Sequence, residues 1–302
     1  MVNIIAKRNI FFALSGVMVM LSMVALLVFG LKPSIDFTGG SQMTLSFTGE
    51  RPSLSDMQAT VSKVPDLGPI LVQPSGEQGY SFKLRFISET EHQQLLNAVK
   101  NAYEKNNTTV TEDRLETIGP AVSETLKKRS WMATLAVAVT VILYVAYSFR
   151  GVSKPVQSWK FGVSTVISLV HNVGITIGIF AVIGRYYDVQ VDIPFVVALL
   201  TILGYSVNDN IVVLDRIREN LMRRRISDFA TLANTALNET LWRSLNTSIT
   251  ILLVFVALLV FGDASIFTFS LALILGIIIS AYSSVFLAAP LLVAWEKWDR
   301  RK

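Results

Sequence analysis

The amino-acid sequence predicts an α-helical membrane protein with six membrane-spanning helices and one folded α+β domain between the first and second of them. Of its 302 residues, 52% are hydrophobic and 16% are charged, whereas a soluble domain carries about 25% charged residues. The hydrophobic residues are gathered in six long runs, and one long polar stretch separates the first run from the second. The mean hydropathy of +0.51 also indicates a chain that lies largely in lipid.

A helix needs roughly 20 apolar residues to cross the hydrocarbon core of a bilayer. All six runs reach that length or come near it, and the fifth is the shortest, with its most apolar part at Ile249–Phe261. The first run is too long for the core of a signal peptide, so we interpret it as a retained helix. The predicted spans are Ile10–Gly30, Trp131–Phe149, Phe161–Gly184, Ile193–Leu214, Asn246–Phe261 and Ile266–Trp295.

These spans divide the chain into three parts. Residues 1–34 form a short tail and the first helix, residues 35–125 form the α+β domain, and residues 126–302 form a region of five helices. Between the fourth and fifth spans, the segment at about 216–243 carries Leu221, Phe229, Leu232 and Ala236 at helical spacing. This pattern predicts an amphipathic helix that lies along the cytoplasmic membrane interface.

The lysine and arginine residues predict the orientation of the spans, because cytoplasmic loops carry an excess of them. On this rule both termini are cytoplasmic and the α+β domain is extracytoplasmic. Lys127–Arg129 fall on the opposite side, but they end a long loop, and long loops cross the membrane largely regardless of charge. The basic groups that set the orientation are Lys7–Arg8, Arg150–Lys160, Arg216–Arg225 and Lys297–Lys302.

The polar stretch after the first span reads as a small soluble domain. Its expected elements follow the order β-α-β-β-α-β, which is that of a ferredoxin-like split βαβ unit. His92 is the only histidine in this domain, and its polar neighbours Glu91, Gln93 and Gln94 predict an exposed position. The expected elements are strands at Ser41–Phe47, Pro69–Gln73, Tyr80–Phe86 and Thr109–Ile118, and helices at Ser53–Val64 and Glu89–Lys105.

Several polar residues lie inside the predicted spans, where an ionisable group is costly and by default marks a functional or paired site. Asp209 lies sixteen residues after Ile193, a distance of roughly 24 Å along a helix, and it stands between Asn208 and Asn210. His171 and Asn172 lie near the middle of the third span. Arg243 precedes the fifth span, at a depth comparable with that of Asp209.

A carboxylate, a histidine and an arginine on three neighbouring spans suggest a relay for a proton or another cation, in which protonation of Asp209 releases Arg243. The residues predicted for this relay are Asp209, Arg243, His171, Asn172, Asn208 and Asn210. Less specific interpretations stay open for each residue. Asp209 is also compatible with a purely structural ion pair, and Arg243 with a side chain that extends to the interface. His171 and Asn172 are also compatible with hydrogen bonds between helices.

Other classes of function lack their sequence signals. The chain has no cysteine and two histidines, so disulfides and thiolate metal sites are excluded. It contains no phosphate-binding Gly-x-x-x-x-Gly-Lys-Ser/Thr loop, no His-Glu-x-x-His and no Gly-x-Ser-x-Gly. We therefore expect neither an enzyme nor an ATP-driven protein. The net charge of +5 is explained by basic residues at the ends of spans, and it does not predict nucleic-acid binding.

At this point four stretches of the chain resemble the SecF family, the smaller membrane subunits of the bacterial SecD–SecF pair in the RND (resistance-nodulation-division) superfamily. The first is similar to the family's (I/F)DFTGG motif, and the likeness covers essentially the whole chain in the same order. The four stretches are Ile35–Gly40, Gly119–Ser123 ahead of the second span, Gly204–Asn220 in the fourth span and Asn238–Ser248 at the entry to the fifth.

The resemblance implies half of an RND-type helical bundle in the bacterial cytoplasmic (inner) membrane. It implies an auxiliary role in which the proton or sodium gradient assists preprotein export, with no other cofactor. The implied partners are SecD, the SecYEG channel, YajC, the unfolded preprotein and membrane lipid, without nucleic acid. Asp209 would be the ion-titrating carboxylate and Arg243 its counter-charge. A structural hinge and turn below the α+β domain would be formed by Asp36, Phe37, Thr38, Gly39 and Gly40.

Two departures from the family pattern leave the coupling ion open between proton and sodium. Many relatives have His-Asp where this chain has His171-Asn172, and a small hydroxyl residue is common where Asn210 stands. Two other functions compete with ion-coupled export. The first is an RND-type exporter of lipids or small molecules, which predicts a larger outer domain, and the second is a structural assembly subunit without ion coupling.

Overall fold

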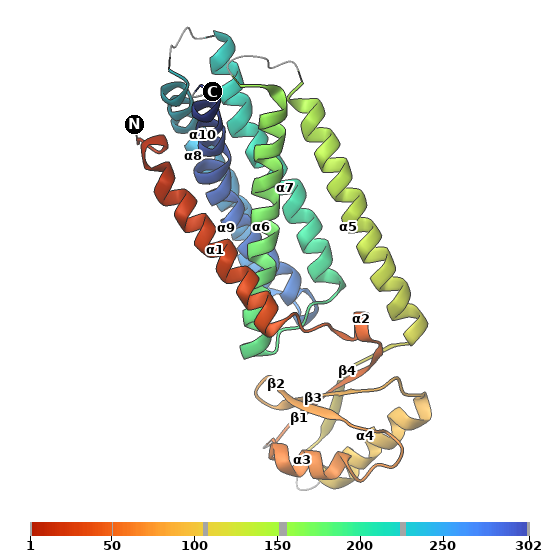
Figure 1. Ribbon diagram of the computed structural model, residues 1–302. Coiled ribbons are helices and arrows are strands. Elements are labelled where there is room, and N and C mark those ends of the chain that lie inside the picture. The colour runs from red at the N-terminus through yellow and green to blue at the C-terminus, as the bar shows by residue number, and fades with distance from the viewer. Residues whose placement is uncertain (1, 50, 105–107, 151–155, 224–227, 301–302) are drawn as a thin grey trace. The chain divides into compact units, whose positions relative to one another are not determined.

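The computed structural model describes the chain except for residues 1, 50, 105–107, 151–155, 224–227 and 301–302. The chain divides into two compact units (Figure 1). We call Met1–Lys32 with Trp131–Lys302 the helical unit, and Pro33–Ser130 the α+β unit. The second boundary lies five residues beyond the expected one, because α5 (Pro120–Ser148) is one continuous helix and no break near residue 125 separates the two units.

Among the described residues, six helices are long and apolar enough to cross a membrane, as the hydrophobic runs predict. The first is preceded by a short 3-10 turn, η1 (Ile5–Lys7), and the last is built from two α-helices joined by the π-helical turn η3 (Ser284–Ala288). The segments are α1 (Arg8–Phe29), α5, α6 (Ser158–Tyr187), α7 (Ile193–Arg223), α8 (Phe229–Phe261), and α9 (Phe267–Ser283) with α10 (Ala289–Asp299).

The predicted amphipathic interfacial helix at about 216–243 is wrong. Helix α7 continues to Arg223 and α8 already begins at Phe229, so the segment consists of the end of one long helix and the start of the next, apart from residues 224–227 outside the described part. Its apolar residues Phe229, Leu232 and Ala236 are buried in the main core of the helical unit. The apolar stripe therefore packs against protein and not against a membrane surface.

Helix α6 and the last span form the centre of the helical unit. In their most apolar stretches, 50% and 61% of the residues are buried, compared with 6% for α5 and 11% each for α1 and α8. Helix α1 approaches α6 closely at Gly178, where an added Cβ would lie 2.5 Å from the Cα of Ser22. The outer helices leave most of their surface uncovered within this chain, as expected for helices that face lipid or a partner.

Both termini lie at the same end of the helical unit (Figure 1). The side chains of Asn234 and Asn238, at the start of α8, accept hydrogen bonds from the backbone N–H groups of Ile4 and Val2, at 2.9 Å in each case. Near the other terminus, the buried ammonium group of Lys160 pairs with Asp299. These contacts fasten the two ends of the chain to the first turns of α8 and α6.

The α+β unit has the expected order of elements and a ferredoxin-like sheet. Its four strands are antiparallel in the order β2-β3-β1-β4, and a short helix, α2 (Ile35–Thr38), precedes them. Phe86, the last residue of the expected strand Tyr80–Phe86, lies beyond the end of β3 and is 47% exposed. The other elements are β1 (Gly40–Phe47), α3 (Leu54–Val61), β2 (Leu71–Ser75), β3 (Gly79–Leu84), α4 (Glu89–Tyr103) and β4 (Val110–Ile118).

The prediction that His92 is exposed is wrong, since only 5% of it is accessible. His92 lies one turn before Leu95 and Leu96, on the face of α4 that packs into the core. Its Nδ1 lies 3.1 Å from a carboxylate oxygen of Glu89, and its Nε2 lies 3.1 Å from one of Glu112. The polar neighbours in sequence lie on other faces of the helix, so they do not report on this position.

The motif at residues 34–40 forms a turn that leads into the sheet. Ser34 caps α2 by accepting a hydrogen bond from the backbone N–H of Asp36 at 3.2 Å. Gly39 and Gly40 follow with φ angles of +70° and +124°, which residues with a Cβ rarely adopt. A Cβ at Gly40 would also lie 2.6 Å from the carbonyl oxygen of Leu84 on the paired strand β3. The two glycines are therefore required by the backbone at this turn.

Candidate ion-coupling site

Asp209 lies on the face of α7 that is packed against α8. The residue is 5% exposed, and its Oδ1 accepts a hydrogen bond from the hydroxyl of Ser244 on α8. Its Oδ2 is buried and accepts no hydrogen bond of standard geometry within the described part of the chain, with the Ser284 side chain on η3 as a hydroxyl neighbour besides Ser244. A buried carboxylate that is only half satisfied is costly, which is the kind of exception expected at a functional site.

A second polar pair joins the same two helices one turn away. The hydroxyl groups of Tyr205 and Ser248 lie 2.7 Å apart. Tyr205 and Asp209 are four residues apart on α7, and Ser244 and Ser248 are four residues apart on α8, so each pair lies on one helix face. The two helices run antiparallel, and their contact at this level is made by polar groups.

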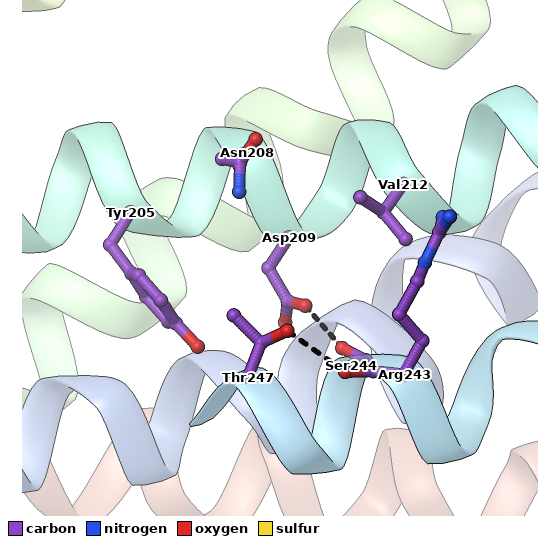
Figure 2. Close-up of a pocket in the computed structure, with 7 residues that line it drawn as sticks. All are labelled: Tyr205, Asn208, Asp209, Val212, Arg243, Ser244 and Thr247. Carbon is purple, nitrogen blue, oxygen red and sulfur yellow. Dashed lines mark hydrogen bonds between the residues drawn. The ribbon is translucent and has the colours of Figure 1, made fainter. Parts of the chain in front are cut away.

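These residues line a pocket of about 270 Å³ between α7 and α8 (Figure 2). Asn208, Arg243 and Thr247 are exposed in this chain, while Asp209 and Ser244 are buried at the wall. The exposed polar side chains lie within segments long and apolar enough to cross a membrane. The lining residues are Tyr205, Asn208, Asp209, Val212, Arg243, Ser244 and Thr247.

The structure brings the predicted pair of Asp209 and Arg243 to one pocket, but it does not pair them. Within the described residues, no carboxylate oxygen lies within 4.0 Å of the Arg243 side-chain nitrogens. Figure 2 shows the Arg243 side chain extending toward the side of Val212, away from the Asp209 carboxylate. The role of Arg243 as the counter-charge of Asp209 stays a prediction.

His171 and Asn172 lie on α6 and contact a different face of α7. Nδ1 of His171 lies 3.0 Å from Oδ1 of Asn172, and Nδ2 of Asn172 donates a hydrogen bond of 2.6 Å to the hydroxyl of Ser206. The His171 ring stacks on Tyr282 of α9, with a centroid distance of 6.3 Å. Neither residue lines the pocket around Asp209, so this pair is connected to α7 but not directly to the carboxylate.

The two asparagines beside Asp209 point to opposite sides of α7. Asn208 lines the pocket, whereas Asn210 is fully buried and donates a hydrogen bond of 3.3 Å to the hydroxyl of Ser168 on α6. Ser168 in turn donates to the hydroxyl of Ser283 on α9 at 2.9 Å. Of the six residues predicted for the relay, Asp209, Asn208 and Arg243 share the pocket, while His171, Asn172 and Asn210 belong to the interior between α6, α7 and α9.

Tyr205, Ser244, Thr247 and Ser248 were not assigned a role from the sequence. The signal in the sequence is weak: Ser244 and Ser248 are four residues apart in α8, and Tyr205 and Asp209 are four residues apart in α7. This spacing becomes informative only when the structure shows that the two pairs face each other. The described residues contain no group of three or more His, Cys, Asp or Glu side chains arranged to hold a metal ion. The groups available for chemistry in this pocket are the buried Asp209 carboxylate, the Arg243 guanidinium group and several hydroxyl groups.

Comparison with known proteins gives a consistent family. The family model described as "Protein export membrane protein SecD/SecF, C-terminal" matches residues 98–298, and the "SecD/SecF GG Motif" model matches residues 24–49, which include Gly39 and Gly40. The protein translocase subunit SecF of Thermobaculum terrenum is 36% identical over 99% of this chain and 95% of its own length. That of Anaerolinea thermophila is 34% identical, over 100% and 96% respectively.

A solved structure has the same fold. The crystal structure of SecDF from Thermus thermophilus, described as a translocon-associated membrane protein, superposes with a TM-score of 0.83 at 31% sequence identity. The match covers 98% of this chain and 39% of that longer chain. The similarity therefore extends over both units of the chain described above.

Proposed function

This chain belongs to the SecD/SecF family of protein export membrane proteins, and we propose that it is an auxiliary subunit of a protein translocase in which ion binding at Asp209 assists preprotein export. The observation that carries the proposal is the half-satisfied carboxylate of Asp209, buried between α7 and α8 beside a pocket that is also lined by Arg243. The names of its relatives, protein translocase subunits, support the class of function.

The membrane potential supplies enough energy for such a role. One elementary charge that crosses the membrane gains about 2.3 kcal/mol per 100 mV, which shifts a two-state equilibrium by a factor of tens. Neutralising Asp209 with a proton or a sodium ion changes its interaction with Arg243 and Ser244, and so changes the packing of α7 against α8. We propose that the resulting movement of α7 and α8 is transmitted to the α+β unit, which then acts on the preprotein.

The uncovered polar face of α7 and α8 supports a partner in the membrane. Asn208, Arg243 and Thr247 are exposed in this chain, and polar groups at that depth rarely face lipid. In the relatives from Thermus thermophilus and Bacillus subtilis, named SecDF, this chain matches 35% and 38% of a longer protein. We therefore propose that SecD covers this face, and that the pair works with the SecYEG channel and YajC on unfolded preproteins.

We place the protein in the bacterial cytoplasmic membrane with both termini in the cytoplasm. The two termini lie at the same end of the helical unit (Figure 1), together with Lys7, Arg8, Lys160 and Lys297. An excess of basic residues at one end marks the cytoplasmic side. Reporter fusions at each terminus test this orientation directly.

The proposal is tested by Asp209→Asn in cells that lack the native subunit and carry SecD. We expect the rate of preprotein export to fall to that of cells without the subunit, because asparagine keeps the shape of the side chain but cannot be titrated. Glu124→Gln, at an exposed carboxylate of α5 that lines neither this pocket nor the one beside it, is the control and should retain export. Varying the proton and sodium gradients separately identifies the coupling ion. Unchanged export with Asp209→Asn would leave a structural assembly subunit without ion coupling.

A further inference from the structure

Arg243 stands between two pockets that follow the groove between α7 and α8. The second pocket, of about 430 Å³, lies nearer the end of the helical unit that carries the termini, and Val212 and Arg243 line both pockets. On the far side of Arg243 from Asp209, the second pocket contains carboxylates. Its lining residues are Ile211, Val212, Asp215, Arg216, Glu219, Glu239, Thr240 and Arg243.

Glu239 is the carboxylate of this pocket that lies on the same face of α8 as Arg243. The two residues are four positions apart, so their side chains are neighbours on the helix surface. Glu239 is held in place across the groove, because its Oε2 accepts hydrogen bonds from Nε of Arg216 at 2.7 Å and from Nδ2 of Asn220 at 3.0 Å. Its side chain is 22% exposed.

Arg216 pairs with a second carboxylate as well as with Glu239. The same half-buried guanidinium group also donates to Glu219 at 2.6 Å, so it bridges two carboxylates at this level. Glu219 also pairs with the exposed Arg223 at 3.1 Å. A carboxylate offers about four lone-pair sites, so Glu239 can accept a further N–H donor in addition to Arg216 and Asn220.

Arg243 is thus flanked by two carboxylates, one on each side along the groove. Asp209 lies opposite Ser244, the residue next to Arg243, and Glu239 lies one turn in the other direction. An arginine within a membrane is costly without a partner, and in this structure neither the Asp209 nor the Glu239 carboxylate lies within 4.0 Å of the Arg243 side-chain nitrogens. Glu239, one turn away on α8, offers Arg243 a second acceptor when Asp209 becomes neutral. A site that alternates between two states needs a partner for the cation in each of them.

We propose that Glu239 is a positioning residue of the ion-coupling site, which receives the Arg243 guanidinium group when the coupling ion neutralises Asp209. When the ion leaves, the guanidinium group returns to Asp209. This inference rests on the proposed function of Asp209. The plain alternative is that Glu239 only joins the ends of α7 and α8 through Arg216.

The two roles are separated by Glu239→Gln, Arg216→Gln and the exchange of both charges, Arg216→Glu with Glu239→Arg, in the full chain together with SecD. If Glu239 receives Arg243, E239Q lowers gradient-driven export by about tenfold, and R216Q lowers it by no more than about twofold, because the carboxylate is kept. The exchanged pair restores an ion pair between the helices but presents a cation to Arg243, so we expect export as low as with E239Q.

A second readout follows the carboxyl group of Asp209 itself. Dicyclohexylcarbodiimide reacts with neutral carboxyl groups in apolar surroundings, and mass spectrometry measures the modification at Asp209 alone. With E239Q, Arg243 loses its second acceptor and pairs with Asp209 for longer, which favours the charged carboxylate, so we expect labelling to fall by about threefold or more. A merely structural loss of the Arg216 pair would loosen α7 from α8 and leave labelling unchanged or increased.

Each outcome decides between the two roles. Export restored by the exchanged pair, or export lost with E239Q while labelling of Asp209 is unchanged or increased, would overturn the proposal. If D209N abolishes export but E239Q leaves both export and labelling normal, the proposal for Glu239 is wrong and the proposed function stands. If D209N leaves export unaffected, the proposed function itself is wrong. If E239Q fails to accumulate in the membrane, E239D takes its place, because it keeps the charge but moves it away from Arg243. E239D should also lower the labelling of Asp209, and unaltered labelling would contradict the proposal.

Discussion

The hydroxyl of Ser244 on α8 donates a hydrogen bond to Oδ1 of Asp209 on α7. This bond ties the buried carboxylate to the helix that also carries Arg243 and Glu239, so a change of charge at Asp209 is felt directly by α8. The neighbouring bond between Tyr205 and Ser248 joins the same helices without a charged group. The two contacts together allow the effect of the charge to be separated from the effect of helix packing.

We expect Ser244→Ala to destabilise the protein by about 1–3 kcal/mol, because it leaves a buried acceptor without a partner. Ser248→Ala, one turn further along α8, should cost about 1 kcal/mol, since Tyr205 is only half-buried and keeps access to other donors and acceptors. Thermal unfolding in detergent, followed for both variants and for the unchanged protein, measures the difference.

A double-mutant cycle with Asp209→Leu isolates the bond itself. In the Asp209→Leu background, Ser244→Ala should cost much less than in the unchanged protein, while the cost of Ser248→Ala should stay the same. Equal costs of Ser244→Ala in both backgrounds would show that Ser244 contributes through helix packing and not through the carboxylate.

The close approach of α1 to α6 depends on Gly178. A Cβ at this position would lie 2.5 Å from the Cα of Ser22, which is backbone and cannot move without shifting α1. We expect Gly178→Ala to destabilise the helical unit by about 1–3 kcal/mol, as overpacking does. Gly174→Ala is the matched control on the same helix, where nothing lies within 4 Å of the added Cβ.

The control should be neutral or should stabilise α6 by up to about 1 kcal/mol, because alanine favours helix over glycine. Unfolding in detergent measures both variants, and cysteine cross-linking between α1 and α6 reports whether the helices separate. Similar stability for the two variants would contradict the close contact.

The sequence predicted the six spans because their physical cause is simple, since lipid requires long apolar helices with all backbone groups satisfied. It did not predict where the helices end. The predicted span ends at Leu214, whereas helix α7 continues without a break to Arg223, and Arg216 and Arg223 both pair with Glu219 along this extension. Such i,i+3 and i,i+4 pairs support a helix outside the membrane, where hydropathy carries no information.

The burial of Asp209 could be predicted from the sequence, because a carboxylate in an apolar run lies at a depth where water is scarce. Its contact with Ser244 could not, because serine is tolerated in helices and only the register of α8 against α7 shows which serine faces the carboxylate. His92 was misplaced for the same reason in the α+β unit. Its burial depends on the face of α4 that meets the sheet, and the polar residues next to it in sequence do not report that face.

The turn before β1 should be intolerant of a side chain at Gly40. Gly40→Ala combines a φ of +124° with a Cβ that lies 2.6 Å from the carbonyl oxygen of Leu84, so we expect a loss of more than about 2 kcal/mol. Gly76→Ala, in the turn between β2 and β3, meets only the cost of its φ of +60°, about 1 kcal/mol.

Oxidation of Met43 and Met57, both fully buried in the core of the α+β unit, measures unfolding of this unit in the full chain at increasing denaturant. The midpoint should fall clearly further for Gly40→Ala than for Gly76→Ala. Equal midpoints would show that β1 tolerates a side chain at its first residue, against the register found here.

The start of α4 carries a pH-dependent contact at Glu91. Arg85 pairs with its Oε1, and the backbone N–H and hydroxyl of Ser88 donate to its Oε2 at 2.7 and 2.9 Å. The Arg85 guanidinium group first, and the Ser88 donors second, lower the pKa of Glu91 from 4.5 to about 2. Because the folded pKa is the lower one, this contribution to stability is fully present above pH 4.5 and is lost as the pH falls toward 2.

Glu91→Gln should therefore destabilise the α+β unit at pH 6 and make progressively less difference as the pH falls from 4.5 toward 2. Glu77→Gln, at an exposed carboxylate in the turn between β2 and β3, is the control for the removal of one negative charge, and it should leave the midpoint at pH 6 unchanged. Methionine oxidation at Met43 and Met57 again gives the denaturation midpoint at each pH. A difference between Glu91→Gln and the unchanged protein that stays constant from pH 6 to pH 2 would show that the capping contact does not depend on the charge of Glu91.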